Sequence, residues 1–497
     1  MDRSSHDEFR QRRAAAVEAA VRRVIVSPAF LFWAATAAAF VIFFARGPAA
    51  YLHPILYTED GVWTSLIYRR GFWHAVFHAR PDYHVVGNVL GLWLGMQACE
   101  LFCAGNILEL PRTYAIVSYL FFAMTVSLPV LLLHKQLPPR HLLAVWLLGC
   151  FLPIGSSGIE ILGRISNIGY AFVFIGFVLV WFRNVAARTW LDFLLVDLGL
   201  LACVATNPIC FALLPATVWP FLRRLIRERR PLMEVVRSPS MVSLAALALL
   251  SAAVLVKPLT NKQRPNPPFP LTPAVAVEMG VARNALFPLV WPVYEHLSTA
   301  TSLLAAAAVI GCMARIGSRE HRVVYAGGVG LLALTSLVLV ALRPDLRRTV
   351  DDYHCTFPDR YYYGHNLVAV LLLVTLAADA AKRFHGSPGW RRVPDAVLAG
   401  FVVACIARQG IAGISHDQFQ NMEIGTFADC VQTAVDQRRY VTAAGKRHPE
   451  GQYLLVETYA RFSDGTGWRM TLPRPLVERL PQVAERLTLT GAPARRW

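Results

Sequence analysis

Long apolar runs separated by short polar segments dominate the chain. The first covers residues 28–44, and further runs follow at about 85–104, 114–133, 142–154, 168–182, 190–222, 240–256, 297–314, 323–342, 366–381 and 394–407. A helix needs about 20 apolar residues to cross the hydrocarbon core, and the run at 190–222 is long enough for two helices that turn near Asn207. The pattern predicts an all-α polytopic membrane protein, a bundle of about 11 to 13 transmembrane helices.

Lys and Arg gather in some of the loops between these runs and are scarce in others. The four basic clusters are Arg183 and Arg188; Arg223, Arg224, Arg227, Arg229 and Arg230; Arg315, Arg319 and Arg322; and Lys382, Arg383, Arg391 and Arg392. Because positive charge holds loops on the cytoplasmic side, these clusters are predicted to be cytoplasmic. The loops at 46–82, 155–167, 257–296 and 343–365 then lie outside. The basic segment at 1–27 is either a cytoplasmic amphipathic helix on the inner leaflet or a solvated tail.

The charge rule leaves two alternatives between residues 84 and 134. Placing Lys135 and Arg140 inside requires an odd number of crossings here, although the stretch holds two apolar runs. Either the first run, which contains His84, Asn88 and Glu100, is interfacial or re-entrant, or Lys135 and Arg140 are outside and a later hairpin is miscounted. The polar residues in that run favour the first alternative.

Two segments on the predicted outer side differ from simple connections. The loop at 46–82 is rich in aromatic residues, among them Trp63, Trp73 and Phe77, which is typical of short helices at the headgroup layer. The tail at 409–497 is polar and contains a β-like run at 452–456 followed by turn residues at 464–467. The sequence thus predicts a membrane domain at 28–408 and a small α+β extracytoplasmic C-terminal domain.

Composition narrows the class of protein further. The 497 residues are 55% hydrophobic and only 16% charged, outside the range of ordinary soluble domains. The net charge of +17 lies in loop clusters, so it indicates membrane topology and lipid contact, and no nucleic-acid partner is expected. The nine cysteines form no CxxC pair, which argues against a zinc site. Cys355 and Cys430 are the two placed in external polar segments, and a disulfide between them is a hypothesis.

The first candidate for chemistry is the motif Glu59-Asp60-Gly61 in the first external loop. Adjacent carboxylates can share a divalent cation, or one can act as a general base whose proton affinity the other raises by repulsion. Gly61 would let the backbone turn so that both carboxylates point into one cavity. The alternative is an acidic turn in a hydrated loop.

Three further groups lie on the predicted outer side. Glu160, Arg164 and Asn167 are spaced to share one helical face, where an ordinary ion pair at a helix end is the alternative. Arg347 and Arg348 precede Arg360-Tyr361, which could clamp phosphate oxygens or simply anchor an aromatic belt. Lys262 and Arg264 lie in a basic, Pro-rich segment that either attracts an anionic headgroup or only connects two spans.

The order of these motifs resembles that of the GT-C glycosyltransferases, polytopic enzymes that take a sugar from a polyprenyl-phosphate carrier on the extracytoplasmic face. It is most similar to bacterial members that pair an early Glu-Asp-Gly, a middle loop with Glu and Asn, and an Arg-Tyr before a late span. The chain departs from related first loops, which often continue into Gly-Tyr, by reading Asp82-Tyr83-His84. The resemblance covers roughly residues 30–410.

This resemblance implies roles for individual residues. Asp60 would be the catalytic base and Glu59 its partner, and these two carboxylates would also hold Mg²⁺ or Mn²⁺ if the reaction depends on a metal. The candidate substrate-binding residues are Glu160, Asn167, Arg360, Tyr361, Arg347, Arg348, Lys262, Arg264 and His84.

The resemblance also implies a reaction and a location. The chain is expected to transfer a sugar from a polyprenyl-phosphate donor to an envelope glycan, lipid or protein, in the inner membrane of a bacterium. Two alternatives remain: a non-catalytic transporter or flippase of a lipid-linked saccharide, in which Asp192 or Asp197 would serve an ion path, and an envelope-assembly protein whose tail binds a partner.

Overall fold

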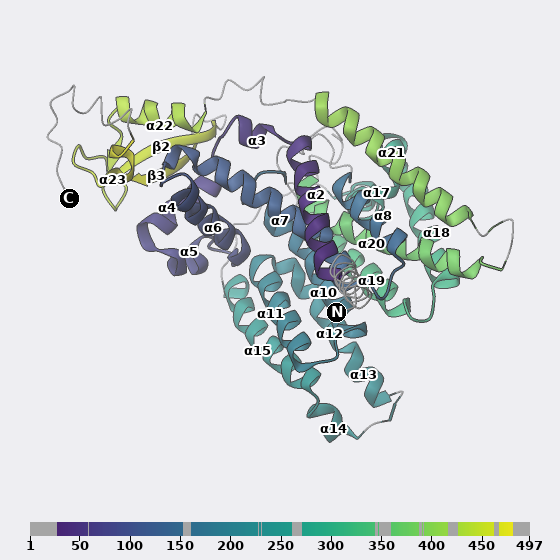
Figure 1. Ribbon diagram of the computed structural model, residues 1–497. Helices are drawn as coiled ribbons and strands as arrows, with labels where there is room; N and C mark the ends of the chain where they lie inside the picture. The colour runs from purple at the N-terminus through teal and green to yellow at the C-terminus, as the bar shows by residue number, and fades with distance from the viewer. Residues whose placement is uncertain are drawn as a thin grey trace, which may run out of the picture.

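A computed structural model describes residues 27–57, 59–152, 161–226, 228–229, 231–260, 271–342, 346, 359–386, 390, 392–415, 426–461 and 467–480. It is a bundle of helices with one small sheet beside it (Figure 1). Nine helical segments of these residues are long and apolar enough to cross a membrane. The prediction of an all-α polytopic protein is confirmed at this level. The predicted segment at 1–27 lies outside the described residues except for Ser27.

The main helices of the bundle are α2 (Pro28–Arg46), α7 (Leu110–Leu132), α8 (Pro139–Cys150), α10 (Phe172–Val185), α11 (Trp190–Thr206), α13 (Trp219–Ile226), α15 (Pro239–Thr260), α18 (Thr299–Ile316), α19 (Arg322–Leu342), α20 (Asp359–Arg383) and α21 (Val393–Ser415). Shorter elements are η1 (Ile107–Glu109), η2 (Ile168–Ala171), η3 (Pro208–Leu213), α12 (Leu214–Thr217), α14 (Leu232–Val236), α16 (Pro273–Val277), η4 (Glu278–Leu286), α17 (Phe287–Val290) and η5 (Trp291–His296). The first loop contains α3 (Ala49–Leu52), α4 (Glu59–Arg70) and α5 (Phe72–His78), and α6 (Val86–Phe102) follows.

Local signals in the sequence set several helix boundaries. Ser27 accepts a hydrogen bond from the N–H of Phe30 and starts α2. Thr189 and Asp192 form a capping box that starts α11. That helix ends at Thr206, and Asn207 then caps η3, so the predicted hairpin turn near Asn207 is confirmed.

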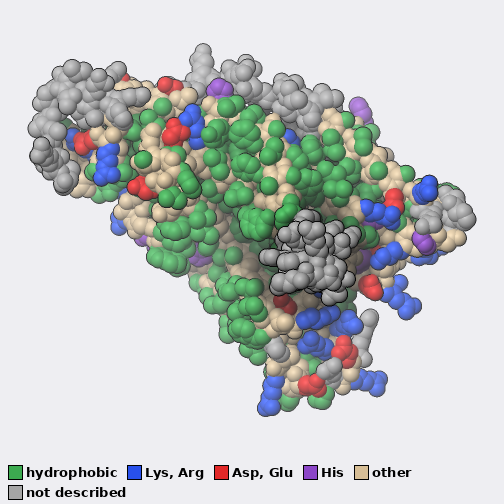
Figure 2. All heavy atoms as spheres, in the orientation of Figure 1, with side chains coloured by type: hydrophobic (Ala, Val, Ile, Leu, Met, Phe, Trp, Pro, Cys, Tyr) green, Lys and Arg blue, Asp and Glu red, His purple; other side chains and the backbone are tan. Residues whose placement is uncertain are grey.

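Basic loops gather at one end of the bundle, which we call the basic end. Arg383 donates to the carbonyl of Arg315, and Arg183 donates to the carbonyl of Ser240 at 2.8 Å. Lys and Arg side chains crowd around α13 and α14, while hydrophobic side chains cover much of the middle of the visible face (Figure 2). The predicted segregation of basic loops is therefore present.

The opposite end, which we call the site end, carries α3 to α6. The hydroxyl of Tyr119 donates to the carbonyl of Gly47 just after α2, and Arg112 Nε donates to the carbonyl of Tyr51 at 3.3 Å. Helix α7 therefore starts at the site end. Its other end leads to Arg140, which pairs with Asp395 at 3.0 Å, close to the basic connection between α20 and α21.

Helix α6 begins and ends at the site end. The N–H of Gly87, in its first turn, donates to Thr206 Oγ1 at the end of α11 (2.9 Å), and its last turn leads through η1 into the start of α7. Of the two alternatives for this stretch, this path of α6 agrees with the first, an interfacial or re-entrant run. Lys135 and Arg140 accordingly lie on the same side as the basic clusters.

Helices α5 and α6 present an apolar surface at the site end. Trp73 and Phe77 on α5 are 71% and 55% exposed, and Leu101 and Phe102 on α6 are 75% and 79% exposed. Aromatic rings next to polar groups favour the headgroup layer of a bilayer. The arrangement fits the interfacial helices that the aromatic loop predicts.

A second apolar stretch bends back on itself. The hydroxyl of Tyr294 donates to Glu278 Oε1 at 2.9 Å, although the two residues are 16 positions apart. A straight helix would separate them by about 24 Å. The bend falls where Pro288 and Pro292 interrupt the helical ladder. The stretch Pro273–Tyr294 thus has the composition of a span but the path of a re-entrant segment.

The tail forms a small α+β unit against the first loop. It contains α22 (Phe427–Asp436), α23 (Arg474–Glu478) and an antiparallel sheet in the order β1 (Tyr440–Val441), β2 (Tyr453–Arg461), β3 (Gly467–Pro473). Its core is built from Phe427, Leu454 and Met470, all buried. The α+β prediction is confirmed, and α21 continues to Ser415, beyond the predicted boundary at 408.

Candidate functional site

Glu59 and Asp60 are the first two residues of α4. Carboxylates at this position are favoured because they interact with the unpaired N–H groups and the positive end of the helix dipole. Gly61 is helical and buried. The predicted backbone turn at Gly61 is therefore wrong: a helix start, rather than glycine flexibility, orients the two carboxylates.

Asp60 is buried, with 2% of its surface exposed. Its Oδ1 accepts a hydrogen bond of 2.7 Å from the N–H of Ser166. Burial raises the pKa of Asp60 to about 7; the positive charge of Arg164 and the Ser166 N–H act in the opposite direction, and Glu59 adds repulsion. A carboxyl group with this pKa can accept a proton near neutral pH.

Glu59 is more exposed and faces a cation. Its Oε1 lies 4.0 Å from Arg80 Nη1. Arg80 also binds Asp82 through both carboxylate oxygens, at 3.0 and 3.1 Å, and its guanidinium lies 4.5 Å from the ring centre of Tyr83. Burial opposes the charge on Arg80, but Tyr83 and Asp82 outweigh it, so the pKa of Arg80 is raised.

The segment after Ile161 passes beside Asp60 in an irregular conformation. Gly163 has φ +78°, and a Cβ at this position would collide with Ala50. Because residues 162–167 are not helical, the predicted helical face shared by Glu160, Arg164 and Asn167 is wrong. Glu160 itself lies outside the described residues.

Buried side chains hold this irregular segment in place. Arg164 donates to the carbonyl of Ile55 at 3.2 Å and lies 5.2 Å from the ring centre of Tyr57. Asn88 donates to the carbonyls of Ile165 and Ser166, both at 2.8 Å. The N–H of Ser166 is therefore aimed at Asp60 by contacts from α6 and from the first loop.

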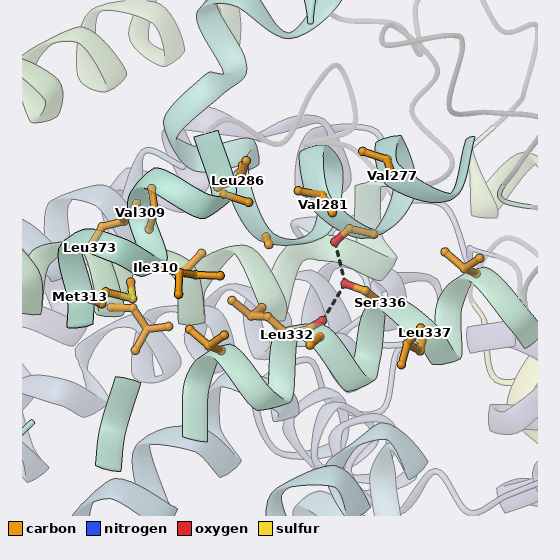
Figure 3. A pocket seen from close by; sticks show the side chains of 18 of the residues that line it. Val277, Val281, Leu286, Val309, Ile310, Met313, Leu332, Ser336, Leu337 and Leu373 are labelled. Atoms are coloured by element: carbon orange, nitrogen blue, oxygen red, sulfur yellow. Dashed lines mark hydrogen bonds between the residues drawn. The ribbon is translucent and has the colours of Figure 1, made fainter. Parts of the chain in front are cut away.

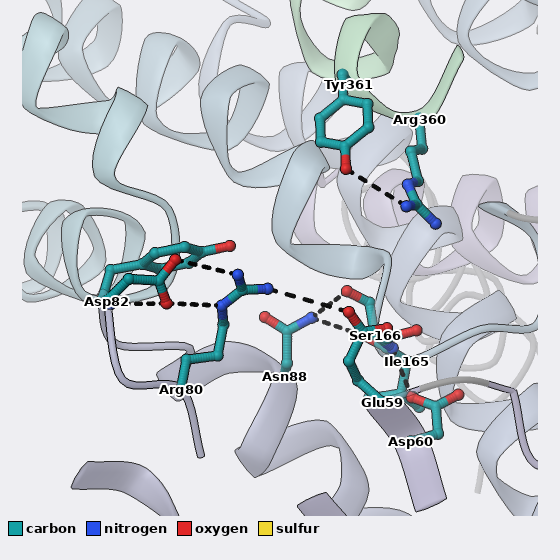
Figure 4. A network of polar contacts seen from close by, with 10 residues as sticks. Glu59, Asp60, Arg80, Asp82, Asn88, Ile165, Ser166, Arg360 and Tyr361 are labelled. Atoms are coloured by element: carbon teal, nitrogen blue, oxygen red, sulfur yellow. Dashed lines mark hydrogen bonds and ion pairs between the residues drawn. The ribbon is translucent and has the colours of Figure 1, made fainter. Parts of the chain in front are cut away.

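Arg360 and Tyr361 start α20 and point toward the carboxylates from the other side (Figure 4). Arg360 is 8% exposed, and its Nη2 lies 3.3 Å from the hydroxyl of Tyr361. The ring of Tyr361 lies 4.8 Å from that of Tyr170. Four residues predicted for the site, Glu59, Asp60, Arg360 and Tyr361, thus share one region at the site end.

The structure describes some of the remaining predicted residues and not others. Asn167 is buried next to Ser166, directly before η2. His84 precedes α6 and packs against Phe77, and burial, with Lys257 nearby, lowers the pKa of His84. The predicted residues that lie outside the described part of the chain are Lys262, Arg264, Arg347, Arg348 and Cys355. The Cys355–Cys430 disulfide therefore stays a prediction.

The metal prediction rests on Glu59 and Asp60 alone. Within the described residues, no three His, Cys, Asp or Glu side chains gather as metal ligands do. Two carboxylates on one helical turn can bind Mg²⁺ or Mn²⁺ together with substrate phosphate oxygens, so the metal stays a prediction.

Several residues of the site escape sequence reasoning. Arg80, Asn88 and Tyr170 lie in loops or apolar runs where no short motif marks them. Ser166 Oγ is buried and has no hydrogen-bond partner among the described residues. The pairing of Arg80 with Asp82 two residues away is the one local signal that could have been noticed.

An apolar cavity of about 440 Å³ lies between η4, α18, α19 and α20 (Figure 3). Val281, Val309 and Leu332 line it. The hydroxyl of Ser336 donates hydrogen bonds to the carbonyls of Gly280 and Leu332. Val340 both lines the cavity and packs on the cluster of Tyr361 and Tyr362. The cavity thus approaches the helix turn that carries Arg360.

No protein-family model, curated protein or solved structure matches this chain.

Proposed function

We propose that the protein is a membrane glycosyltransferase that moves a sugar from a polyprenyl-phosphate donor to an acceptor hydroxyl. The observation that carries the proposal is the buried Asp60 carboxyl, with a pKa of about 7, beside Glu59, which faces Arg80, in the region toward which Arg360 and Tyr361 point from α20. A base and cations beside an apolar bundle are what this reaction needs.

The proposed reaction is a single displacement at the anomeric carbon. Asp60 takes the proton of the acceptor hydroxyl while that oxygen forms a bond to the anomeric carbon. The bond from this carbon to the phosphate oxygen breaks, and the phosphate leaves with the electron pair. Arg360, with Tyr361 beside it, and Arg80 stabilise the negative charge of the leaving phosphate.

The apolar cavity supports a lipid-linked donor. Its lining is mostly aliphatic side chains from five helical elements, α16, η4, α18, α19 and α20, and such a surface suits a hydrocarbon chain. Because Val340 lines the cavity and packs against the cluster that includes Tyr361, a chain in the cavity would bring the attached phosphate toward Arg360.

The residues expected for a transporter have other roles. Asp192 caps α11 and is half-buried, and Asp197 binds Arg183 through both oxygens at 2.7 and 3.1 Å. Both carboxylates are thus explained by helix capping and ion pairing. No described contact of these two favours an ion path, so we propose transfer rather than transport.

The test is the Asp60→Asn variant in proteoliposomes supplied with radiolabelled polyprenyl-phosphate hexoses or pentoses and an envelope extract as acceptor. We expect transfer to fall by at least about a hundredfold, because the base is lost. The matched control is Asp192→Asn, which removes a half-buried carboxylate far from the site and should keep transfer. Transfer retained by Asp60→Asn would overturn Asp60 as the base, whereas movement of lipid-linked sugar without product would favour a flippase.

A further inference from the structure

The tail and the Asp60-bearing segment are joined by hydrogen bonds at two separate places. The N–H of Phe427, at the start of α22, donates to the carbonyl of Pro54 at 2.8 Å. The N–H of Thr471, on β3, donates to Ser65 Oγ at 2.7 Å. These bonds lie on either side of Asp60 in the sequence.

Ser65 also binds the helical turn that carries Asp60. Its hydroxyl donates to the carbonyl of Gly61 at 2.7 Å, and the neighbouring Thr64 donates to the carbonyl of Asp60 at 2.6 Å. Ser65 is 8% exposed, so water competes little for these bonds. A movement of β3 would therefore disturb the hydrogen bonds of the first turn of α4.

The geometry of the sheet explains why Thr471 faces α4. Thr471 is opposite Leu455, whose N–H points away from β3 and donates to the carbonyl of Arg439. In such a non-hydrogen-bonded antiparallel pair, the N–H groups of both residues point outward. Two residues later the equivalent outward position holds Pro473, which has no N–H to donate. The edge of β3 thus uses the N–H of Thr471 to bind α4.

The far end of α4 is also attached to the tail. Arg69 donates to the carbonyl of Ala443, and its guanidinium lies 5.7 Å from the ring centre of Tyr453. Contacts before, within and at the end of α4 therefore come from the same small unit.

We propose that this unit, residues 426–461 and 467–480, which we call the appendage, is a positioning part of the site: it fixes α4 so that the carboxylate of Asp60 stays buried against Ser166. The proposal rests on the proposed function for its meaning, but the contact itself can be tested without any substrate. The charged groups that act on Asp60 are its neighbour Glu59, which itself faces Arg80, and Arg164 from the segment beside it, and the hydroxyl of Tyr114 on α7 is also close. The appendage therefore acts through position and exclusion of water rather than through charge.

The first experiment compares Thr471→Pro with Thr471→Val in the full chain in nanodiscs. Proline removes the N–H that binds Ser65, whereas valine keeps it and removes only a hydroxyl that has no partner among the described residues. Hydrogen exchange measured by mass spectrometry should be about fivefold faster for α4 peptides in Thr471→Pro and unchanged in Thr471→Val, with α20 peptides unchanged in both. Equal exchange in α4 for both variants would overturn the proposal that the appendage fixes α4.

The second experiment uses the pH dependence of sugar transfer. Ser65→Ala removes the acceptor of the Thr471 N–H, and Ser65→Thr restores a hydroxyl. A looser α4 lets water reach Asp60, so the acidic limb of the pH profile should move to lower pH in Ser65→Ala and Thr471→Pro, with kcat reduced about tenfold and KM for the donor little changed. Ser65→Thr and Thr471→Val should behave as the native chain.

The two experiments separate failure of this proposal from failure of the proposed function. Faster α4 exchange in a chain that transfers no sugar would support the attachment of α4 to the appendage and would overturn the proposed transferase function. Faster α4 exchange with an unchanged pH profile in an active enzyme would overturn the positioning of Asp60 while the transferase stands.

Discussion

Two buried carboxylates at opposite ends of the bundle have very different hydrogen-bond and ion-pair partners. At the basic end, Asp197 meets the guanidinium of Arg183 through two bonds of 2.7 and 3.1 Å, and Ser243 donates to it as well. At the site end, Asp60 accepts a backbone N–H from Ser166, while Arg164 binds the carbonyl of Ile55. The guanidinium of Arg183 balances the charge of the buried Asp197, whereas Asp60 is desolvated without such a pair and is kept ready to take a proton.

Arg183→Ala should have the largest effect on stability. It leaves Asp197 charged and buried without its guanidinium, which costs about 3–5 kcal/mol in the free energy of unfolding. Thermal unfolding in detergent would measure the change. The double variant Arg183→Met with Asp197→Leu should recover most of the loss, and a double variant as unstable as the single one would mean that the pair has a role beyond neutralisation.

Asp60→Asn should give the opposite pattern. Transfer should fall by at least about a hundredfold, as above, yet stability should be equal or higher, because a neutral amide is less costly to bury than a carboxylate. The same unfolding measurement, made beside the transfer assay, checks this. A large loss of stability in Asp60→Asn would place Asp60 with Asp197 among the structural carboxylates.

Arg360→Lys should raise KM for the polyprenyl-phosphate donor by about tenfold, with a smaller change in kcat. Lysine keeps the charge but loses the planar pair of donors that matches phosphate oxygens. Steady-state kinetics with varied donor test this, and Arg140→Lys, at an exposed ion pair of the basic end, is the matched control. A KM equal to that of the native chain would remove Arg360 from the phosphate contacts.

The pH dependence of stability gives a further test of the difference between the two carboxylates. The pKa of Asp60 is raised in the folded chain, to about 7, above its ordinary value near 4 in the unfolded chain. Its contribution to stability is therefore fully present below about pH 4 and is lost as the pH rises through about 7, with a slope of at most about 1.4 kcal/mol per pH unit. The difference in melting temperature between the native chain and Asp60→Asn should change across this window, and a constant difference would contradict the raised pKa.

Part of the site could be predicted because some of its residues are adjacent in the sequence and form short motifs. Glu59-Asp60 and Arg360-Tyr361 are short motifs beside apolar runs, and the structure brings them into one region. Ser166, Asn88 and Arg80 could not be predicted in this way. Their importance comes from contacts with residues far away in the sequence, such as the bond from Ser166 to Asp60 across 106 positions.

The sequence by itself determined the helical membrane class, the gathering of basic loops at one end, the turn near Asn207 and the β-structure of the tail. Hydropathy, charge and turn chemistry are properties of short windows, so they can be read without a fold. Only the tertiary structure decided that α6 does not connect the two ends, that Pro273–Tyr294 bends back, and that the appendage holds α4. Each of these depends on which distant groups satisfy a backbone or side-chain hydrogen bond, and composition does not specify that.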